Sequence, residues 1–188
     1  MIKVLFVCHD GIPLLDLKGL LQEEEIQSLI ERIVSRGGMV KNLHGQKNLY
    51  YQVNATYYSA LGASDEKMLL ARAIQMFMPG KPQVWYLDLF AGKNDHEAVQ
   101  RAGESGHKEI NRTNLSTDQI AEGLKKDVVQ KQLALIRMRN THKAFSEGAE
   151  VAISGGEKSL EIRWEYNSAF VTLYVNFESG TYTIVESR

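Results

Sequence analysis

The feature that most constrains the fold is a change of hydrophobic period near Phe145. Before this residue apolar side chains recur at helical spacing, and after it they alternate with polar ones, as in strands with one buried face. The alternating apolar residues are Leu160, Ile162, Trp164, Tyr166, Val171, Leu173, Val175, Phe177, Tyr182 and Ile184. Turn residues at Gly155-Gly156, Asn167-Ser168 and Ser179-Gly180 separate them. The pattern predicts an antiparallel β-domain at residues 147–188.

Two helices are predicted in the first part of the chain. Residues 23–36 repeat apolar side chains at i, i+3, i+4, i+7 and i+8, begin with three glutamates and end at Gly37-Gly38. Residues 64–78 begin with a serine cap and an acidic first turn, and Pro79-Gly80 follows them. This second segment is apolar almost all round, so we expect it to be buried.

The region between residues 91 and 141 is predicted to be a loop followed by two helices. Residues 91–113 contain three glycines and read as a loop. Ser116 and Gln119 stand at the spacing of a capping box, which predicts a short helix. Residues 127–141 carry an apolar stripe and predict a further helix.

Two short apolar runs, Ile2–Val7 and Gln83–Leu89, predict strands buried on both faces, the habit of parallel sheets. Trp85 and Tyr86, in the second run, are interpreted as core residues. Two such strands cannot close a sheet and would leave unpaired edges. We therefore expect residues 1–146 to be an α/β segment of a larger parallel sheet.

Composition excludes several classes of function. The net charge of −1 gives no electrostatic footprint for nucleic acid or an acidic membrane surface, and no apolar run approaches the ~20 residues of a membrane span. The single cysteine, Cys8, fits a reducing compartment, so we expect a cytoplasmic protein. Cys8, His9, His96 and His107 do not form a recognisable metal-binding spacing.

His9-Asp10 directly follows the first predicted strand. In barrels of parallel strands, catalytic groups project from that end of a strand. Taken alone, such a pair is more often the start of a loop or a helix cap.

The segments around and after this pair carry a family resemblance. Val7-Cys8-His9-Asp10-Gly11-Ile12 resembles the seventh-strand segment of alpha-amylase-type glycoside hydrolases, and the later segments are similar to their sucrose phosphorylase branch. These segments keep the order and approximate spacing of that branch across roughly residues 9–145. They are Tyr51-Gln52-Val53-Asn54-Ala55-Thr56-Tyr57-Tyr58-Ser59-Ala60-Leu61-Gly62, Ala71-Arg72-Ala73-Ile74-Gln75, Pro79-Gly80-Lys81-Pro82-Gln83-Val84, Ala91-Gly92-Lys93-Asn94-Asp95 and Ile110-Asn111-Arg112.

The resemblance implies a (β/α)8 barrel whose seventh and eighth strands are residues 2–7 and 83–89, followed by a β-sheet domain. It implies reversible phosphorolysis of sucrose or a related glucoside with retention, through a covalent glucosyl-enzyme formed by a nucleophile and an acid/base. Asp10 matches a third aspartate, which stabilises the transition state, and His9 matches its glucose-contacting neighbour. The nucleophile and the acid/base belong to earlier strands, and no residue here matches them. The isolated chain is therefore expected to be an inactive fragment.

The resemblance also implies substrate-binding residues. Tyr51 and Gln52 match acceptor-side residues of a mobile loop, although such residues at a strand start are more often structural. The preceding loop offers His44 and Lys47 as cationic donors, which would suit a phosphorylated sugar such as sucrose 6-phosphate, or would simply be solvated. Lys108 stands where the family usually has a glucose-contacting arginine.

The expected partners are a small-molecule sugar and inorganic phosphate, with neither nucleic acid nor membrane, and no metal or organic cofactor is expected. The missing barrel half, or a second copy of the chain, is a further candidate partner. The alternative function is a non-catalytic carbohydrate-binding or interaction remnant of the barrel.

Overall fold

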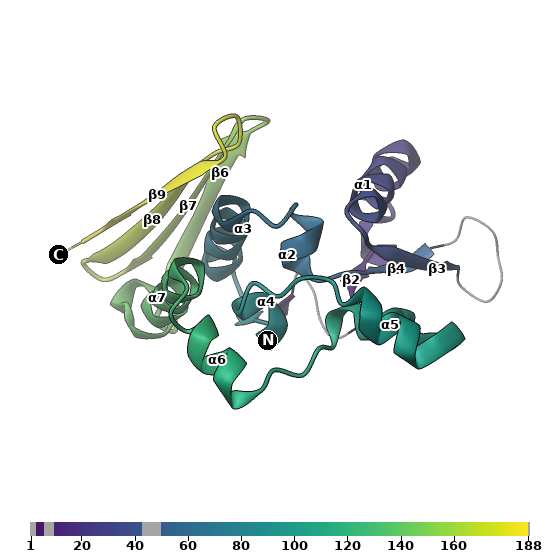
Figure 1. Cartoon of the computed structure of the whole chain (residues 1–188). Coiled ribbons are helices and arrows are strands. Elements are labelled where there is room, and N and C mark those ends of the chain that lie inside the picture. The colour runs from purple at the N-terminus through teal and green to yellow at the C-terminus, as the bar shows by residue number, and fades with distance from the viewer. Residues whose placement is uncertain (1–2, 6–9, 43–49, 188) are drawn as a thin grey trace. The chain divides into compact units, whose positions relative to one another are not determined.

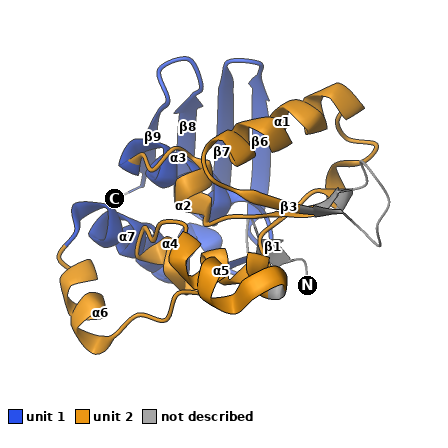
Figure 2. Ribbon diagram, turned by 45° about the vertical axis from the view of Figure 1, so that its right-hand side comes forward, with its two compact units in different colours: residues 1–4, 65–83, 126–188 blue, residues 5–64, 84–125 orange. Residues whose placement is uncertain are grey.

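The computed structural model describes residues 3–5, 10–42 and 50–187 of the chain (Figure 1). Its helices and strands fall into two compact units, each built from separate stretches of sequence (Figure 2). Unit 1 comprises residues 1–4, 65–83 and 126–188, and unit 2 comprises residues 5–64 and 84–125. The predicted domains, residues 1–146 and 147–188, are continuous stretches of sequence, whereas each of these units combines separate stretches. The predicted boundary at residue 146 stays a prediction.

Unit 2 contains a three-stranded antiparallel sheet in the order β2-β4-β3. Its strands are β2 (Ile12–Pro13), β3 (Met39–Asn42) and β4 (Tyr50–Asn54). A short 3-10 helix, η1 (Leu15–Leu17), and α1 (Glu23–Ser35) belong to the same unit. Helix α1 was predicted correctly, and its apolar stripe packs into a core made of Leu14, Ile26, Ile30, Ile33, Val53, Ala55 and Ala60.

The described part of unit 2 also contains five short helices. They are α2 (Tyr57–Ala60), α4 (Tyr86–Leu89), α5 (His96–Ala102), the 3-10 helix η3 (Gly103–Asn111) and α6 (Thr117–Gly123). The predicted capping box is confirmed, because the Ser116 hydroxyl accepts from Gln119 N and the Gln119 side chain accepts from Ser116 N. The prediction of a plain loop over residues 91–113 is wrong, since α5 and η3 occupy most of it.

The predicted strand over Gln83–Leu89 is wrong beyond its first residue. The strand, β5 (Lys81–Gln83), ends where the prediction began, and α4 follows after Trp85. Leu87 and Asp88 are 2% and 0% exposed, so this helical turn is buried. Asp88 Oδ1 also accepts from Tyr57 N at 2.8 Å, which ties this turn to the start of α2.

Unit 1 carries the long helices α3 (Asp65–Phe77) and α7 (Asp127–Thr141), both as predicted. Their packing includes a buried bond from Arg72 Nε to Gln132 Oε1 at 2.8 Å. Strand β5 pairs with β1 (Lys3–Leu5), the described part of the first predicted strand. Gln75 Nε2 donates to the main-chain oxygen of Gln83 at 2.8 Å, which anchors β5 to α3.

The four-stranded antiparallel sheet of unit 1 confirms the alternation seen after Phe145. Its order is β6-β7-β8-β9, with strands Glu150–Gly156, Ser159–Tyr166, Ala169–Asn176 and Thr181–Glu186. The predicted inward residues Ile162, Trp164, Val171, Leu173 and Val175 are buried. Phe177 is 46% exposed, against the prediction, because β8 ends one residue before it.

Trp164 is the main anchor of this sheet within unit 1. Its indole N–H donates to the main-chain oxygen of Phe77 at 2.7 Å, and its ring meets the Phe145 ring at a centroid distance of 5.3 Å. The Arg139 guanidinium lies 4.4 Å from the Trp164 ring and 4.5 Å from the Phe145 ring, so it stacks on both. The sheet is thereby held to the ends of α3 and α7.

Within the described ranges, no helix is long and apolar enough to cross a membrane.

Candidate active-site residues

Asp10 is the centre of an ion cluster in unit 2. Its Oδ1 accepts from Lys108 Nζ at 2.7 Å and from Arg112 Nη2 at 3.0 Å. The three side chains are 33%, 36% and 31% exposed, so the cluster is partly shielded from water without being sealed. Two donors on one carboxylate oxygen hold the Asp10 side chain in one orientation.

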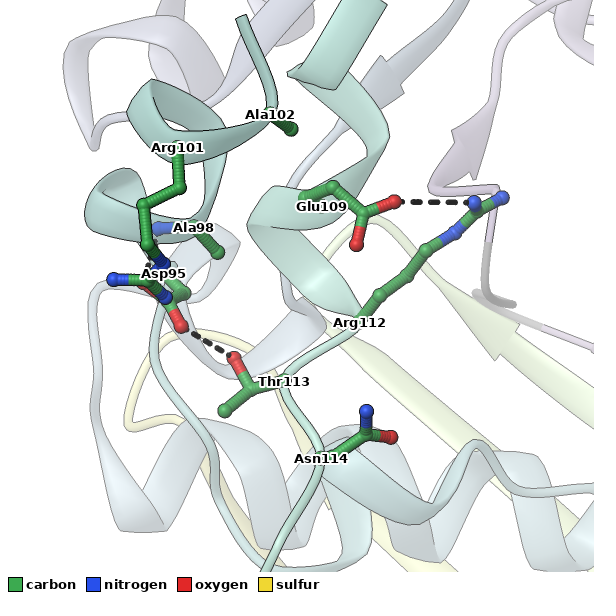
Figure 3. A pocket seen from close by; sticks show the side chains of 8 residues that line it. All are labelled: Asp95, Ala98, Arg101, Ala102, Glu109, Arg112, Thr113 and Asn114. Atoms are coloured by element: carbon green, nitrogen blue, oxygen red, sulfur yellow. Dashed lines mark hydrogen bonds and ion pairs between the residues drawn. The ribbon is translucent and has the colours of Figure 1, made fainter.

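Arg112 is itself held by a second acid. Its Nη1 lies 3.4 Å from Glu109 Oε1, one turn earlier in η3 (Figure 3). The guanidinium therefore bridges Glu109 and Asp10 with different nitrogens, the fork geometry that arginine offers and lysine lacks. The sequence placed Arg112 in the family segment Ile110-Asn111-Arg112 but indicated no role for it. Its partner Asp10 lies about a hundred positions away, so no local pattern connects the two.

The main chain at Asp10 is also fixed. The fully buried Asn54 donates from Nδ2 to the main-chain oxygen of Asp10 at 2.6 Å. Gly11 follows with φ of +108°, and a Cβ at this position would stand 2.4 Å from the main-chain oxygen of Val53. Only glycine suits this conformation and this close approach to β4. Asp10 is thus held through its backbone as well as through its carboxylate.

Three of the remaining predicted site residues lie in the described part of the chain, and three do not. Lys108 lies in the Asp10 cluster, and Gln52 lies on β4, 7% exposed. Tyr51 lies on the same strand. His9, His44 and Lys47 lie outside the described residues.

The segment Ala91–Asp95 braces neighbouring elements of unit 2. The Asn94 side chain accepts from Thr56 N at 2.8 Å, and Asn94 N donates to the Ser59 hydroxyl at 3.0 Å. Asp95 caps α5 by accepting from Ala98 N at 2.8 Å. That N–H, together with the Thr113 hydroxyl and Arg101, lowers the pKa of Asp95 against an opposing effect of burial.

A polar pocket of about 490 Å³ adjoins the cluster through Arg112 (Figure 3). Its lining residues are Asp95, Ala98, Arg101, Ala102, Glu109, Arg112, Thr113 and Asn114. Four of the lining residues are charged, namely Asp95, Arg101, Glu109 and Arg112. No group of three or more His, Cys, Asp or Glu side chains that could hold a metal ion occurs in the described part of the chain.

Comparisons with known proteins connect this arrangement to one group of enzymes. The chain is 51% identical over 96% of its length to a sucrose 6(F)-phosphate phosphorylase of Ilumatobacter coccineus. It is 39% identical over 94% to a sucrose 6(F)-phosphate phosphorylase of Thermoanaerobacterium thermosaccharolyticum, and 39% identical over 95% to a sucrose phosphorylase of Agrobacterium vitis. No family model matches the chain.

A solved structure of the same group of enzymes is similar to this chain in fold. The crystal structure of sucrose 6F-phosphate phosphorylase from Thermoanaerobacter thermosaccharolyticum superposes with a TM-score of 0.91 at 37% identity and covers 99% of this chain. The chain covers 39% of that structure, its carboxyl-terminal part, and between 36% and 38% of the three relatives. The predicted fold class, the carboxyl-terminal part of such an enzyme, is confirmed.

Proposed function

Because this chain belongs to the sucrose phosphorylase family and matches the carboxyl-terminal part of its members, we propose that it forms one side of a retaining glucosyl-transfer site. The reaction is the reversible phosphorolysis of sucrose, or of its 6-phosphate, to glucose 1-phosphate. The observation that carries the proposal is the Asp10 carboxylate, which lies after β1 and is held by Lys108 and Arg112.

In this proposal Asp10 is the transition-state stabiliser. As the glycosidic bond breaks, positive charge develops on the glucose ring, and a fixed carboxylate facing that ring lowers the barrier. The two cations keep Asp10 in place, so little reorganisation is needed at the moment of reaction. His9 contacts the same glucose unit.

The nucleophile and the acid/base come from outside this chain. A retaining glycosidase site needs two carboxylates about 5–5.5 Å apart, one to form the glucosyl ester and one to protonate the leaving oxygen. We assign neither role to a residue of this chain. The alpha-amylase-type barrel half that would supply both is a required partner, so residues 1–188 alone turn over no substrate.

The donor we propose is sucrose 6(F)-phosphate. Two of the relatives reported above carry that name, and the stretch of sequence before β4 contains His44 and Lys47, which can bind a phosphate on the fructosyl side. Tyr51 and Gln52 contact the acceptor side, where a fructosyl group and inorganic phosphate alternate. Lys108 contacts the glucosyl unit beside Asp10.

The proposed enzyme works in the cytoplasm without a metal or organic cofactor. The single cysteine supports a reducing compartment. A non-catalytic, carbohydrate-binding remnant is the less favoured alternative, because the relatives are named as phosphorylases.

A chimera tests the proposed function. Residues 1–188 replace the matching carboxyl-terminal part of the Ilumatobacter coccineus enzyme, which restores a nucleophile and an acid/base to the same site. We expect glucose 1-phosphate to form from sucrose 6-phosphate and phosphate with the chimera and not with the isolated chain. Turnover by residues 1–188 alone would refute the division of roles, and a folded but inactive chimera would refute the proposal as a whole.

His44 and Lys47 give a prediction about substrate specificity. Replacing His44 and Lys47 together with alanine in the chimera removes two phosphate-binding groups and leaves the glucosyl side unchanged. We expect kcat/KM for sucrose 6-phosphate to fall by roughly a hundredfold, since the two charge-assisted hydrogen bonds together contribute at least about 3 kcal/mol. The value for sucrose should change less than threefold. Equal losses for both substrates would show that His44 and Lys47 do not bind the phosphate.

A further inference from the structure

The segment that carries Arg112 is pinned to its surroundings at successive residues. Asp95 N donates to the main-chain oxygen of Ile110 at 2.9 Å, and the Thr113 hydroxyl donates to Asp95 Oδ2 at 3.0 Å. Ile110 is fully buried, as is Asn111. The two ends of this short stretch are therefore fixed in place.

Trp85 and Tyr86 supply the bonds that lie on either side of Arg112. Trp85 Nε1 donates to the main-chain oxygen of Asn111 at 3.0 Å, and the Tyr86 hydroxyl donates to the main-chain oxygen of Thr113 at 2.5 Å. Their rings contact each other at a centroid distance of 4.6 Å, so each restricts the rotation of the other. Burial raises the pKa of Tyr86, which keeps its hydroxyl protonated as a donor.

We propose that Trp85 and Tyr86 are positioning residues, which hold the backbone around Arg112 so that its guanidinium stays on Asp10. The two aromatic side chains donate to the carbonyls on either side of Arg112. Arg112 Nη2 in turn donates to Asp10 Oδ1 at 3.0 Å. A displacement of about 1 Å in a catalytic group can cost a hundredfold in rate, so such a brace matters for turnover. The catalytic part of this inference rests on the proposed function of Asp10, whereas the coupling itself does not.

The coupling is testable in the chain as it stands. Nuclear magnetic resonance of residues 1–188 measures solvent exchange of the Arg112 Nη protons. Tyr86→Phe removes one hydroxyl and keeps the ring, and Trp85→Phe removes the indole N–H. We expect each to accelerate the exchange by about twofold to tenfold, because each variant removes one neutral hydrogen bond to a main-chain carbonyl. Tyr182→Phe, in unit 1, is the control and should leave the exchange unchanged, and thermal unfolding confirms that all three variants are folded.

A double-mutant cycle separates positioning from a general loosening of the structure. In the Asp10→Asn background the ion pair is weakened, so Tyr86→Phe should add less than a twofold change in exchange. Full additivity of the two effects, or an unchanged exchange rate in Tyr86→Phe, would overturn the inference.

Steady-state kinetics of the chimera distinguish a failure of the positioning role of Tyr86 from a failure of the proposed function of Asp10. We expect Tyr86→Phe to lower kcat by roughly tenfold with KM within twofold, because the ground-state contacts remain. If Tyr86→Phe accelerates exchange while neither it nor Asp10→Asn changes kcat, the positioning stands and the catalytic role of Asp10 falls. If exchange is unchanged while Asp10→Asn abolishes turnover, the proposed function stands and the positioning falls.

Discussion

Replacing Asp10 with asparagine is expected to lower kcat of the chimera by roughly 100- to 1,000-fold, the largest effect on activity that the structure predicts. Asparagine keeps the size of the side chain and removes the negative charge that would face the developing cation. Lys108 and Arg112 would then lie next to a neutral group, and their positive charges would oppose the transition state directly. We expect KM for sucrose 6-phosphate to change by only a few fold, because the lost interaction is made mainly in the transition state.

The matched control is Asp16→Asn, an exposed carboxylate in η1 of the same unit. It removes the same charge from a position without contact to Lys108 or Arg112 in the ion pairs described above. Its kcat should stay within twofold of the unchanged chimera. If Asp10→Asn loses no more activity than Asp16→Asn, Asp10 has no role in the transition state.

The largest expected effect on stability comes from Trp164→Ala in unit 1. The indole is 8% exposed, donates to the main-chain oxygen of Phe77, and contacts both the Phe145 ring and the Arg139 guanidinium. Its removal leaves a cavity, an unpaired main-chain oxygen at the end of α3 and a guanidinium without one of its two rings. We expect the free energy of unfolding to fall by about 3–5 kcal/mol in urea denaturation.

Two further variants show how much of this loss comes from the N–H donor and how much is specific to Trp164. Trp164→Phe keeps an aromatic ring and loses the N–H donor, so it should cost about 1–3 kcal/mol, less than alanine. Tyr174→Ala, on β8 of the same sheet and 43% exposed, should change the free energy of unfolding by no more than about 0.5 kcal/mol. Similar losses for Trp164→Ala and Tyr174→Ala would show that Trp164 does not anchor the sheet.

Hydrophobic period and capping chemistry predicted the long helices, the start of α6 and the carboxyl-terminal sheet. Helices α1 and α7 and the inward residues of β7 and β8 follow from the spacing of their apolar residues. Helix α3 follows from its serine cap, its acidic first turn and the Pro79-Gly80 after it. The turn before α6 followed from the pairing of Ser116 with Gln119. These features are local, so a short window of sequence contains the information that determines them.

The prediction failed where an apolar run had two possible structures. Residues 83–89 are short and apolar, and period does not distinguish a buried strand from a buried helical turn at that length. The choice is made by tertiary contacts: Asp88 accepts from Tyr57 N, and Trp85 and Tyr86 donate to carbonyls near Arg112. None of these partners is near in sequence.

The candidate site was predicted in part. Asp10 and Lys108 were both named from family segments, and they meet at 2.7 Å. The bridging role of Arg112 and the bond from Asn54 to the Asp10 main chain were missed, because both depend on how distant segments fold together. Distinguishing an arginine that holds a carboxylate from one that is merely solvated needs coordinates.

The central claim is that the Asp10 carboxylate faces a glucose ring, and a crystal structure of the chimera with glucose bound tests it most directly. We predict an Asp10 carboxylate oxygen about 2.5–3.0 Å from a glucose hydroxyl, with Arg112 still on the same carboxylate. Glucose bound in the site with the Asp10 side chain turned away into solvent, too far for any hydrogen bond, would contradict the account.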